Sequence, residues 1–154
     1  MIDLGDHLPA LECQATGETT IHLPSHHQGP LLIFFYPRAS TPGCTREAEG
    51  FRDHYAAFQQ AGCAILGASR DSLRAQQRFA DKLELPYPLL ADPEETLCNA
   101  FGVIGEKMMY GKTVRGIQRS SFLFDSNGQL VEQWRKVKVP GHVETVLEAV
   151  KALV

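Results

Sequence analysis

The sequence predicts an α/β protein in which helices flank a central mixed β-sheet. Two short, continuous apolar runs are typical of strands buried on both faces of such a sheet. Segments with the apolar spacing of helices alternate with these runs, and a hairpin followed by one more helix completes the chain. The chain has 154 residues, 44% of them hydrophobic. We therefore expect a single domain, residues 1–154, with a substantial core.

The first half of the chain predicts two strands, each followed by a helix. The strands are "PLLIFFYP", residues 30–37, and "CAILGAS", residues 63–69. Apolar residues between them, at positions 44, 48, 51, 55 and 58, alternate intervals of four and three, which predicts a helix over residues 41–62. Residues 71–83 predict a second helix, with an inward face made by Leu73, Phe79 and Leu83.

The second half predicts shorter elements, then a hairpin and a helix. "YPLLAD", residues 87–92, is a short extended piece, and Pro93 suits the first position of a short helix over residues 93–102. Residues 118–139 predict a hairpin whose turn is Ser126-Asn127-Gly128. The last helix has an apolar face made by Val143, Val146, Leu147, Val150 and Leu153.

Three further groups of residues are interpreted as structural. "GEKMMYGK", residues 105–112, predicts a loop in which Met108, Met109 and Tyr110 contact the core. The basic cluster of Arg135, Lys136 and Lys138 predicts a solvated strand face. His26 and His27 are adjacent, so on a strand they would point to opposite faces and could not share a metal. No partner is evident for His54 or His142.

Charge and composition argue against several kinds of partner. Lys and Arg number 15 and Asp and Glu 18, so the net charge of −3 disfavours nucleic acid and anionic membranes. No apolar run approaches the roughly 20 residues of a membrane span. The first residues lack the basic start and apolar stretch of a secretory signal, so a cytoplasmic location is expected. There the four cysteines should be thiols, and the lack of a CxxC argues against structural zinc and a dithiol motif.

One cysteine occupies a position with chemical consequences. In "TPGC", Thr41 suits the N-cap of the first helix and Pro42 its first position, so Cys44 falls at the third. Unpaired backbone N–H groups and the positive helix end favour a thiolate there, and the thiolate is the nucleophilic form. The alternative is that Cys44 is only the first apolar residue of the helix face. These residues alone leave both interpretations open.

The wider pattern around Cys44 resembles a known family. Pro37, Thr41 and Cys44 in "PRASTPGC", followed by "TRE", resemble the active-site signature of peroxiredoxins, most closely the bacterioferritin comigratory protein group, or Q type. The resemblance continues over residues 67–131 and includes Arg119 in "GIQRSSFLF". It implies a thioredoxin-like fold and the reduction of hydrogen peroxide and organic hydroperoxides, with no metal, haem or other cofactor.

The same resemblance assigns roles to five residues. Cys44 would be the peroxidatic cysteine, which attacks the O–O bond and becomes a sulfenic acid. Thr41 would bind the peroxide, and Arg119 would support the thiolate and the negative charge that develops on oxygen. Pro37 would shield the sulfur from water, and Glu47 would hold Arg119. Without the resemblance, Thr41 could be an N-cap only, Arg119 a solvated strand residue and Glu47 an exposed first-turn acid.

The sequence departs from the family where a second thiol is expected. Many Q-type relatives place a resolving cysteine five residues after the peroxidatic one, which is Glu49 here, and others place it in the following helix, at Ala80. No resolving cysteine therefore stands at the family positions. Cys98 remains as a poor candidate, while Cys63, which opens a strand, and Cys13 should be inert.

Two functions therefore remain in view. One is a peroxidase, expected to be a monomer, that is reduced by thioredoxin, glutaredoxin with glutathione, or another thiol. The other is a peroxide-sensing module that relays its oxidation to a partner protein. A cysteine phosphatase is excluded, because its Cys-x5-Arg cradle would need arginine at position 50, where this chain has glycine.

Overall fold

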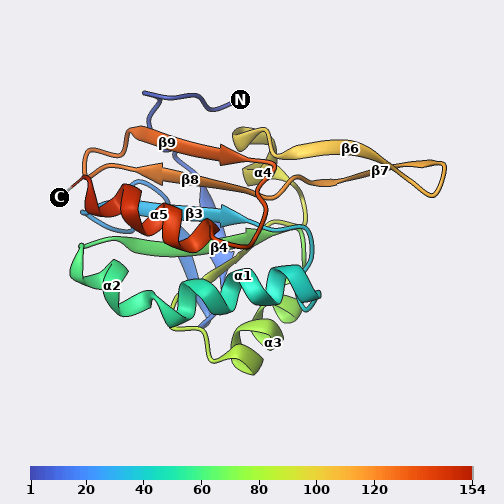
Figure 1. Cartoon of the computed structure of the whole chain (residues 1–154), viewed down its shortest axis with the longest axis horizontal. Coiled ribbons are helices and arrows are strands. Elements are labelled where there is room, and N and C mark those ends of the chain that lie inside the picture. The colour runs from blue at the N-terminus through green and yellow to red at the C-terminus, as the bar shows by residue number, and fades with distance from the viewer. Residues whose placement is uncertain (154) are drawn as a thin grey trace.

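The computed structural model describes residues 1–153 and has the predicted α/β architecture (Figure 1). A seven-stranded sheet runs in the order β2-β1-β5-β4-β3-β8-β9. Its strands are β1 (Glu12–Ala15), β2 (Thr19–His22), β3 (Leu31–Phe35), β4 (Ala64–Ser69), β5 (Leu89–Ala91), β8 (Ser120–Phe124) and β9 (Leu130–Arg135). β3, β4 and β5 are parallel and the other pairs antiparallel, so the sheet is mixed as predicted.

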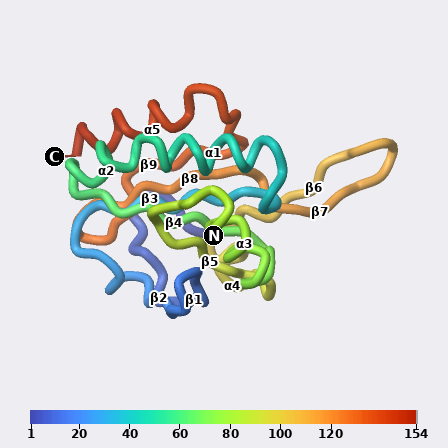
Figure 2. The backbone as a smooth tube through the Cα atoms, turned by 90° about the horizontal axis from the view of Figure 1, so that it is seen from below, coloured from blue at the N-terminus to red at the C-terminus, as the bar shows by residue number. Residues whose placement is uncertain are grey.

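Five helices cover the sheet: α1 (Pro42–Asp53), α2 (Tyr55–Gln60), α3 (Leu73–Leu83), α4 (Thr96–Phe101) and α5 (His142–Lys151). α1, α2 and α5 form a layer on one side, whereas α4 lies on the other side (Figure 2). β3 occupies the middle of the sheet with all five residues buried, which explains its uninterrupted apolar sequence.

The side chains of β3 divide the interior into two hydrophobic clusters, because successive strand residues point to opposite faces. Leu32 and Phe34 face the cluster that also contains Phe51 of α1, Phe79 of α3 and Val146 of α5, which we call the α1-side core. Leu31, Ile33 and Phe35 face the cluster that contains Leu97 and Phe101 of α4, which we call the α4-side core. Full burial of each such side chain contributes roughly 1.5–3 kcal/mol.

Two predicted helix boundaries are wrong for local reasons. The helix expected over residues 41–62 is interrupted at His54, whose ring nitrogen Nδ1 lies 2.9 Å from the Gly50 carbonyl oxygen. The helix expected to begin at Pro93 begins at Thr96 instead. The Asp92 carboxylate accepts hydrogen bonds from the backbone N–H groups of Leu97 and Cys98. These N–H groups have no partner within the helix, so the carboxylate stabilises a helix that starts at Thr96.

Two predicted side-chain environments are also wrong. Arg135 is not on a solvated face, because its guanidinium donates to the carbonyls of Phe101 and Gly102 at 3.0 Å and lies over the Phe122 ring. Leu153 is 39% exposed and does not extend the buried face of α5.

The segment expected to be a loop over residues 105–112 is part of a second sheet. β6 (Ile104–Met109) and β7 (Lys112–Ile117) form an antiparallel hairpin that projects from the body of the molecule (Figure 1). Tyr110 and Gly111 connect the strands, and both have positive φ angles, as a type I′ turn requires. The expected core contact of this segment is wrong, since Met108, Met109 and Tyr110 are all exposed.

Candidate active site

The loop between β3 and α1 is fixed by residues on the neighbouring elements. The backbone N–H of Ala39 donates to the Asp71 carboxylate at 2.8 Å, and the Tyr36 hydroxyl donates to the side chain of Gln76 on α3. Asp71 is itself bound by the Ser69 hydroxyl at the end of β4. The end of the central strand and the start of α1 therefore have a defined geometry, although the residues between them have no regular structure.

The start of α1 has the arrangement that the sequence predicts. Thr41 is the N-cap residue with extended backbone, Pro42 follows at the first helical position, and the Cys44 side chain is 1% exposed. Thr41 differs from a usual cap, because its hydroxyl donates to the Arg38 carbonyl at 2.8 Å and does not bond to the helix. Because its hydrogen is engaged in this bond, the hydroxyl oxygen of Thr41 is left to act as a hydrogen-bond acceptor.

Arg119 contacts Cys44 although the two residues are 75 positions apart in the sequence. It lies between β7 and β8, and its Nη2 donates to the Cys44 sulfur at 3.4 Å. A Cβ atom added to Gly43 would lie 3.3 Å from the same Nη2, so the glycine leaves space for the guanidinium. A fixed cation at this distance stabilises negative charge on sulfur and on any oxygen bound beside it.

Glu47 binds the other side of the same guanidinium. Its Oε1 accepts from Arg119 Nη1 at 2.7 Å, and the carboxyl group is 1% exposed. Burial raises the pKa of Glu47 to about 7, although the charge and hydrogen bond of Arg119 act in the opposite direction. Its second oxygen, Oε2, is buried without a hydrogen-bond partner in the described part of the chain, which is consistent with the partly neutral carboxyl that this pKa implies.

A second pair beside Arg119 was not expected from the sequence. His142, at the start of α5, lies 2.8 Å through Nε2 from the hydroxyl of Ser121 on β8, and both residues are buried. Burial first, and then the Arg119 charge, lower the pKa of His142 to about 4, so it is neutral at pH 7. No spacing in the sequence joins these two residues, because β8 and α5 meet only in the folded chain.

Arg119 thus contacts both Cys44 and Glu47, and the backbone carbonyl of Thr41 accepts the first hydrogen bond of α1 from the N–H of Thr45. Pro37 is exposed in the loop that leads from β3 to α1. Four of the five residues that the sequence predicts for the site therefore lie on the loop after β3 and on α1. The fifth, Arg119, comes from the connection between β7 and β8.

The other cysteines are buried thiols, and no disulfide links any cysteine within residues 1–153. Burial raises the pKa of Cys13 to about 11 and that of Cys63 to about 12, and it also raises the pKa of Cys98. These pKa values disfavour thiolates. Cys98 belongs to the α4-side core, whereas Cys44 belongs to the α1-side core.

The two family positions of a resolving thiol lie on α1 and on α3. Glu49 lies on α1 itself, half-buried, with its carboxylate 3.8 Å from Arg52. Ala80 lies on α3, and its side chain belongs to the α1-side core together with Cys44. Position 80 is therefore on the same face of the sheet as Cys44.

Residues 1–153 contain neither a metal-binding cluster nor a membrane-spanning helix. No group of three or more His, Cys, Asp or Glu side chains is arranged to hold a metal ion. None of the helices there has the length and apolar character to cross a membrane.

Comparison with known proteins identifies close relatives. A model of the AhpC/TSA family matches residues 4–133. Peroxiredoxin Bcp of Xanthomonas campestris is 47% identical over 156 residues, covering 99% of this chain and 98% of the relative. A structure of the X. campestris bacterioferritin comigratory protein, described with respect to its alkyl peroxide reduction activity, has a TM-score of 0.90 at 47% identity and covers 97% of this chain and 98% of that one.

Two further structures bear on the missing thiol. Both are peroxiredoxin Q of X. campestris, 46% identical to this chain, and each has one cysteine changed to serine. The first has a TM-score of 0.92 and covers 99% of this chain and 100% of its own. The second has a TM-score of 0.90 and covers 98% of each chain. The two changed cysteines are 36 residues apart in that protein. Cys44 and Ala80 have the same separation here.

Proposed function

Because the chain belongs to the AhpC/TSA family of peroxiredoxins and is a thiol-dependent peroxidase with the thioredoxin-like fold of that family, we propose that Cys44 is its peroxidatic nucleophile and cycles through a sulfenic acid. The observation that carries the proposal is the 3.4 Å hydrogen bond from Arg119 to the Cys44 sulfur at the first turn of α1. Both the helix end and the guanidinium favour the thiolate, which is the reactive form.

In the proposed first step, the Cys44 thiolate attacks the hydroxyl oxygen of a hydroperoxide, R–O–O–H. A sulfur electron pair forms the S–O bond, and the O–O electron pair leaves with the alkoxide RO⁻. The products are the Cys44 sulfenic acid and, after one proton is taken up, the alcohol ROH. Sulfur is oxidised by two electrons and the peroxide is reduced by two, so the step balances without a metal or cofactor.

Arg119, Thr41 and Pro37 have distinct roles in this step. Negative charge moves from sulfur to the leaving oxygen, and Arg119 donates to both places, so it stabilises the transition state more than the ground state. The Thr41 hydroxyl donates to Arg38, which leaves its oxygen to accept the O–H of the peroxide. Pro37 lies in the exposed loop that precedes the helix, and the resemblance to the family assigns it the role of limiting the access of water to the sulfur.

Glu47 is the proposed positioning residue for Arg119. It binds Nη1 and so leaves Nη2 directed toward Cys44. Because Arg119 is 15% exposed, burial alone would oppose its charge, but Glu47 and Cys44 outweigh this and raise the pKa of Arg119. A permanent cation is thus kept beside the sulfur.

The sulfenic acid is proposed to be reduced by an external thiol. Neither Glu49 nor Ala80 supplies a thiol, and Cys98 faces the opposite core. An external thiol R′SH would form a Cys44 mixed disulfide and water, and a second thiol would release Cys44 with a disulfide of the reductant. Thioredoxin, glutaredoxin with glutathione, and low-molecular-weight thiols are the candidate reductants, and hydrogen peroxide and organic hydroperoxides are the candidate substrates.

The lack of a thiol that could resolve the sulfenic acid within the chain also supports a second candidate function. A sulfenic acid without an internal thiol persists until a partner arrives, which is the behaviour of a peroxide sensor that relays oxidation. A relay consumes one equivalent of peroxide for each equivalent of its partner, whereas a peroxidase turns over with a general reductant.

Steady-state consumption of hydrogen peroxide and of cumene hydroperoxide, with several thiol reductants assayed in parallel, separates the two functions. We expect sustained turnover with at least one reductant in the wild type and background consumption in Cys44→Ser. A single stoichiometric burst with every reductant would favour the relay.

A further inference from the structure

Apolar side chains are exposed on both faces of the tip of the β6–β7 hairpin, residues 107–114, because Met109 and Val114 lie on one face, Met108 on the other and Tyr110 in the turn. Met108 is 68% exposed, Met109 40%, Tyr110 99% and Val114 41%. These are four of the eight large apolar side chains that are exposed among residues 1–153. Clustered exposed apolar side chains of this kind mark interaction sites more often than scattered ones do.

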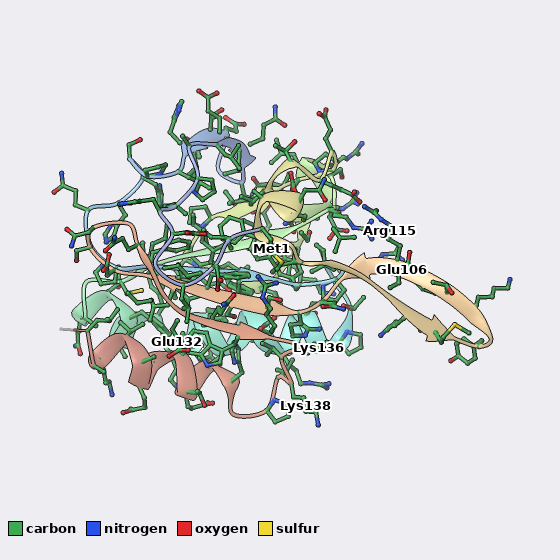
Figure 3. All side chains as sticks on the ribbon, turned by 90° about the horizontal axis from the view of Figure 1, so that it is seen from above. Met1, Glu106, Arg115, Glu132, Lys136 and Lys138 are labelled. Carbon is green, nitrogen blue, oxygen red and sulfur yellow. The ribbon has the colours of Figure 1, made fainter. Side chains whose placement is uncertain are left out.

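The base of the hairpin is anchored to the body of the molecule by ion pairs, and the apolar side chains of the tip lie beyond this anchor. Arg115 donates to the Glu95 carboxylate at 2.6 Å, and Arg70 donates to the same carboxylate at 2.9 Å. Ile117 is buried at the end of β7. Glu106 and Arg115, which are paired across the two strands, lie on the part of the hairpin nearest the body, and the tip extends beyond them (Figure 3).

The base of the hairpin adjoins the reactive sulfur. β7 ends two residues before Arg119, which donates to Cys44. The hairpin projects at the end of the molecule where α1 begins (Figure 1). Strands of six residues rise about 3.4 Å per residue, so the tip lies roughly 20 Å beyond the base. A compact protein of about 100 residues, with a radius of gyration near 13 Å, is large enough to span the distance between the tip and the start of α1.

From these observations we propose that the hairpin tip is the docking surface for a small dithiol protein that reduces oxidised Cys44. The inference rests on the proposed function, in which an external thiol must approach the sulfenic acid. One thiol of the partner attacks the sulfenic sulfur, which gives a mixed disulfide and water. The second thiol of the partner then attacks that disulfide, which releases the Cys44 thiol and leaves the partner as its own intramolecular disulfide.

The chemistry of the tip defines the partner. Lys107 and Lys112 flank the apolar residues, and residues 107–114 contain no acidic side chain in a chain whose net charge is −3. The tip therefore complements an apolar surface bordered by acidic residues. Methionine side chains adapt to a partner's contours, and the hairpin edges offer backbone donors and acceptors. A membrane is less well matched, because anionic surfaces are usually recognised by clusters of roughly four to eight basic residues.

A tip variant that preserves the hairpin tests the proposal. Tyr110→Asn creates the Asn-Gly pair that type I′ turns prefer, and Met108→Thr with Met109→Thr retains strand-forming residues. Val131→Thr, an exposed apolar position on β9, is the matched control. Each protein is assayed for the rate of the peroxide step by stopped flow, for turnover with thioredoxin, thioredoxin reductase and NADPH, and for turnover with dithiothreitol.

We expect the triple variant to raise the KM for thioredoxin about tenfold, with the peroxide step and the dithiothreitol reaction unchanged. The control should match the wild type in all three assays. An unchanged KM for thioredoxin, or a wild type that thioredoxin cannot reduce, overturns the docking proposal. Failure of peroxide to oxidise Cys44 in the wild type overturns the proposed function instead.

Two side experiments detect the competing uses of the tip. Co-sedimentation with vesicles of phosphatidylcholine and phosphatidylserine, lost in the triple variant while the KM for thioredoxin stays unchanged, would make the tip a membrane contact. Sedimentation velocity that shows a wild-type dimer and a monomeric variant would make it a self-association surface. Either result contradicts the proposal.

Discussion

Cys44 and Cys98 are both buried, but they face different hydrophobic cores, so the central sheet lies between their sulfurs. A disulfide requires Cα atoms within roughly 7 Å and side chains directed toward one another. Local unwinding of α1 would expose Cys44 without moving it through the sheet. The structure therefore argues against Cys98 as the resolving residue, for a reason that the sequence could not provide.

The first prediction concerns the position of the missing thiol. Ala80→Cys places a thiol on α3 in the same core as Cys44. After one equivalent of peroxide we expect this variant to form a Cys44-to-position-80 disulfide and to gain turnover with thioredoxin. Ala75→Cys, on the same helix but on a different face, is the control and should form none. Peptide mapping by mass spectrometry detects the crosslink, and its absence in Ala80→Cys would reject the equivalence of position 80 with the relatives' second cysteine.

The second prediction concerns Arg119. Replacing it with alanine removes the donor at 3.4 Å from the Cys44 sulfur and leaves the Glu47 carboxyl unpaired. We expect the peroxide step to slow by about 100-fold or more. Arg119→Lys keeps the charge but cannot bind Glu47 and Cys44 with two nitrogens, so it should recover only part of the rate. Equal peroxide rates in wild type and Arg119→Ala would remove Arg119 from the mechanism.

The third prediction follows from the raised pKa of Glu47. Below pH 4.5, the pKa of the group in the unfolded chain, the carboxyl is neutral in both the folded and the unfolded state. The contribution of the buried neutral carboxyl to the free energy of unfolding is then fully present. As the pH rises to about 7 the unfolded chain ionises while the folded chain retains the proton, so that contribution is lost. The wild type should lose about 3 kcal/mol of unfolding free energy relative to Glu47→Gln across this window. Urea denaturation from pH 4 to pH 8 measures the difference, and parallel curves for the two proteins would exclude a raised pKa.

The fourth prediction concerns His142, for which stability should depend on pH in the opposite direction. The pKa of His142 is lowered from 6.5 to about 4, so the stability due to its neutral form is present above 6.5 and is lost as the pH falls toward 4. His142→Gln retains a partner for Ser121 but does not titrate. Relative to this variant, the wild type should therefore become less stable as the pH decreases. Because Glu47 and His142 titrate in overlapping windows with opposite signs, the wild-type curve alone is expected to be flatter than that of either variant.

The fold was predicted where local sequence determines structure. β3 and α1 were found because an apolar run between prolines and an interval pattern of four and three are local features. β6 and β7 were missed because their distal residues are exposed on both faces, so no alternation of apolar and polar residues marks them. Hydrophobicity likewise predicts core contacts for Met108 and Tyr110, because it does not reveal that the hairpin projects into solvent.

The site was predictable in part. The position of Cys44 at the third residue of a helix follows from Thr41 and Pro42 by local rules. The contact between Arg119 and Cys44 joins residues 75 positions apart, and only the family resemblance placed them together. The His142–Ser121 pair had no signal of either kind, because it depends on the packing of α5 against β8.

The central claim is that, of the four cysteine sulfurs, peroxide oxidises that of Cys44. Intact-mass and peptide analysis after one equivalent of hydrogen peroxide, with dimedone added to trap sulfenic acid, tests it most directly. The account predicts one dimedone adduct per chain, located at Cys44, with Cys13, Cys63 and Cys98 unmodified because their thiols are buried and their pKa values are raised. An adduct on any other cysteine, or the same adduct yield in Cys44→Ser, would contradict it.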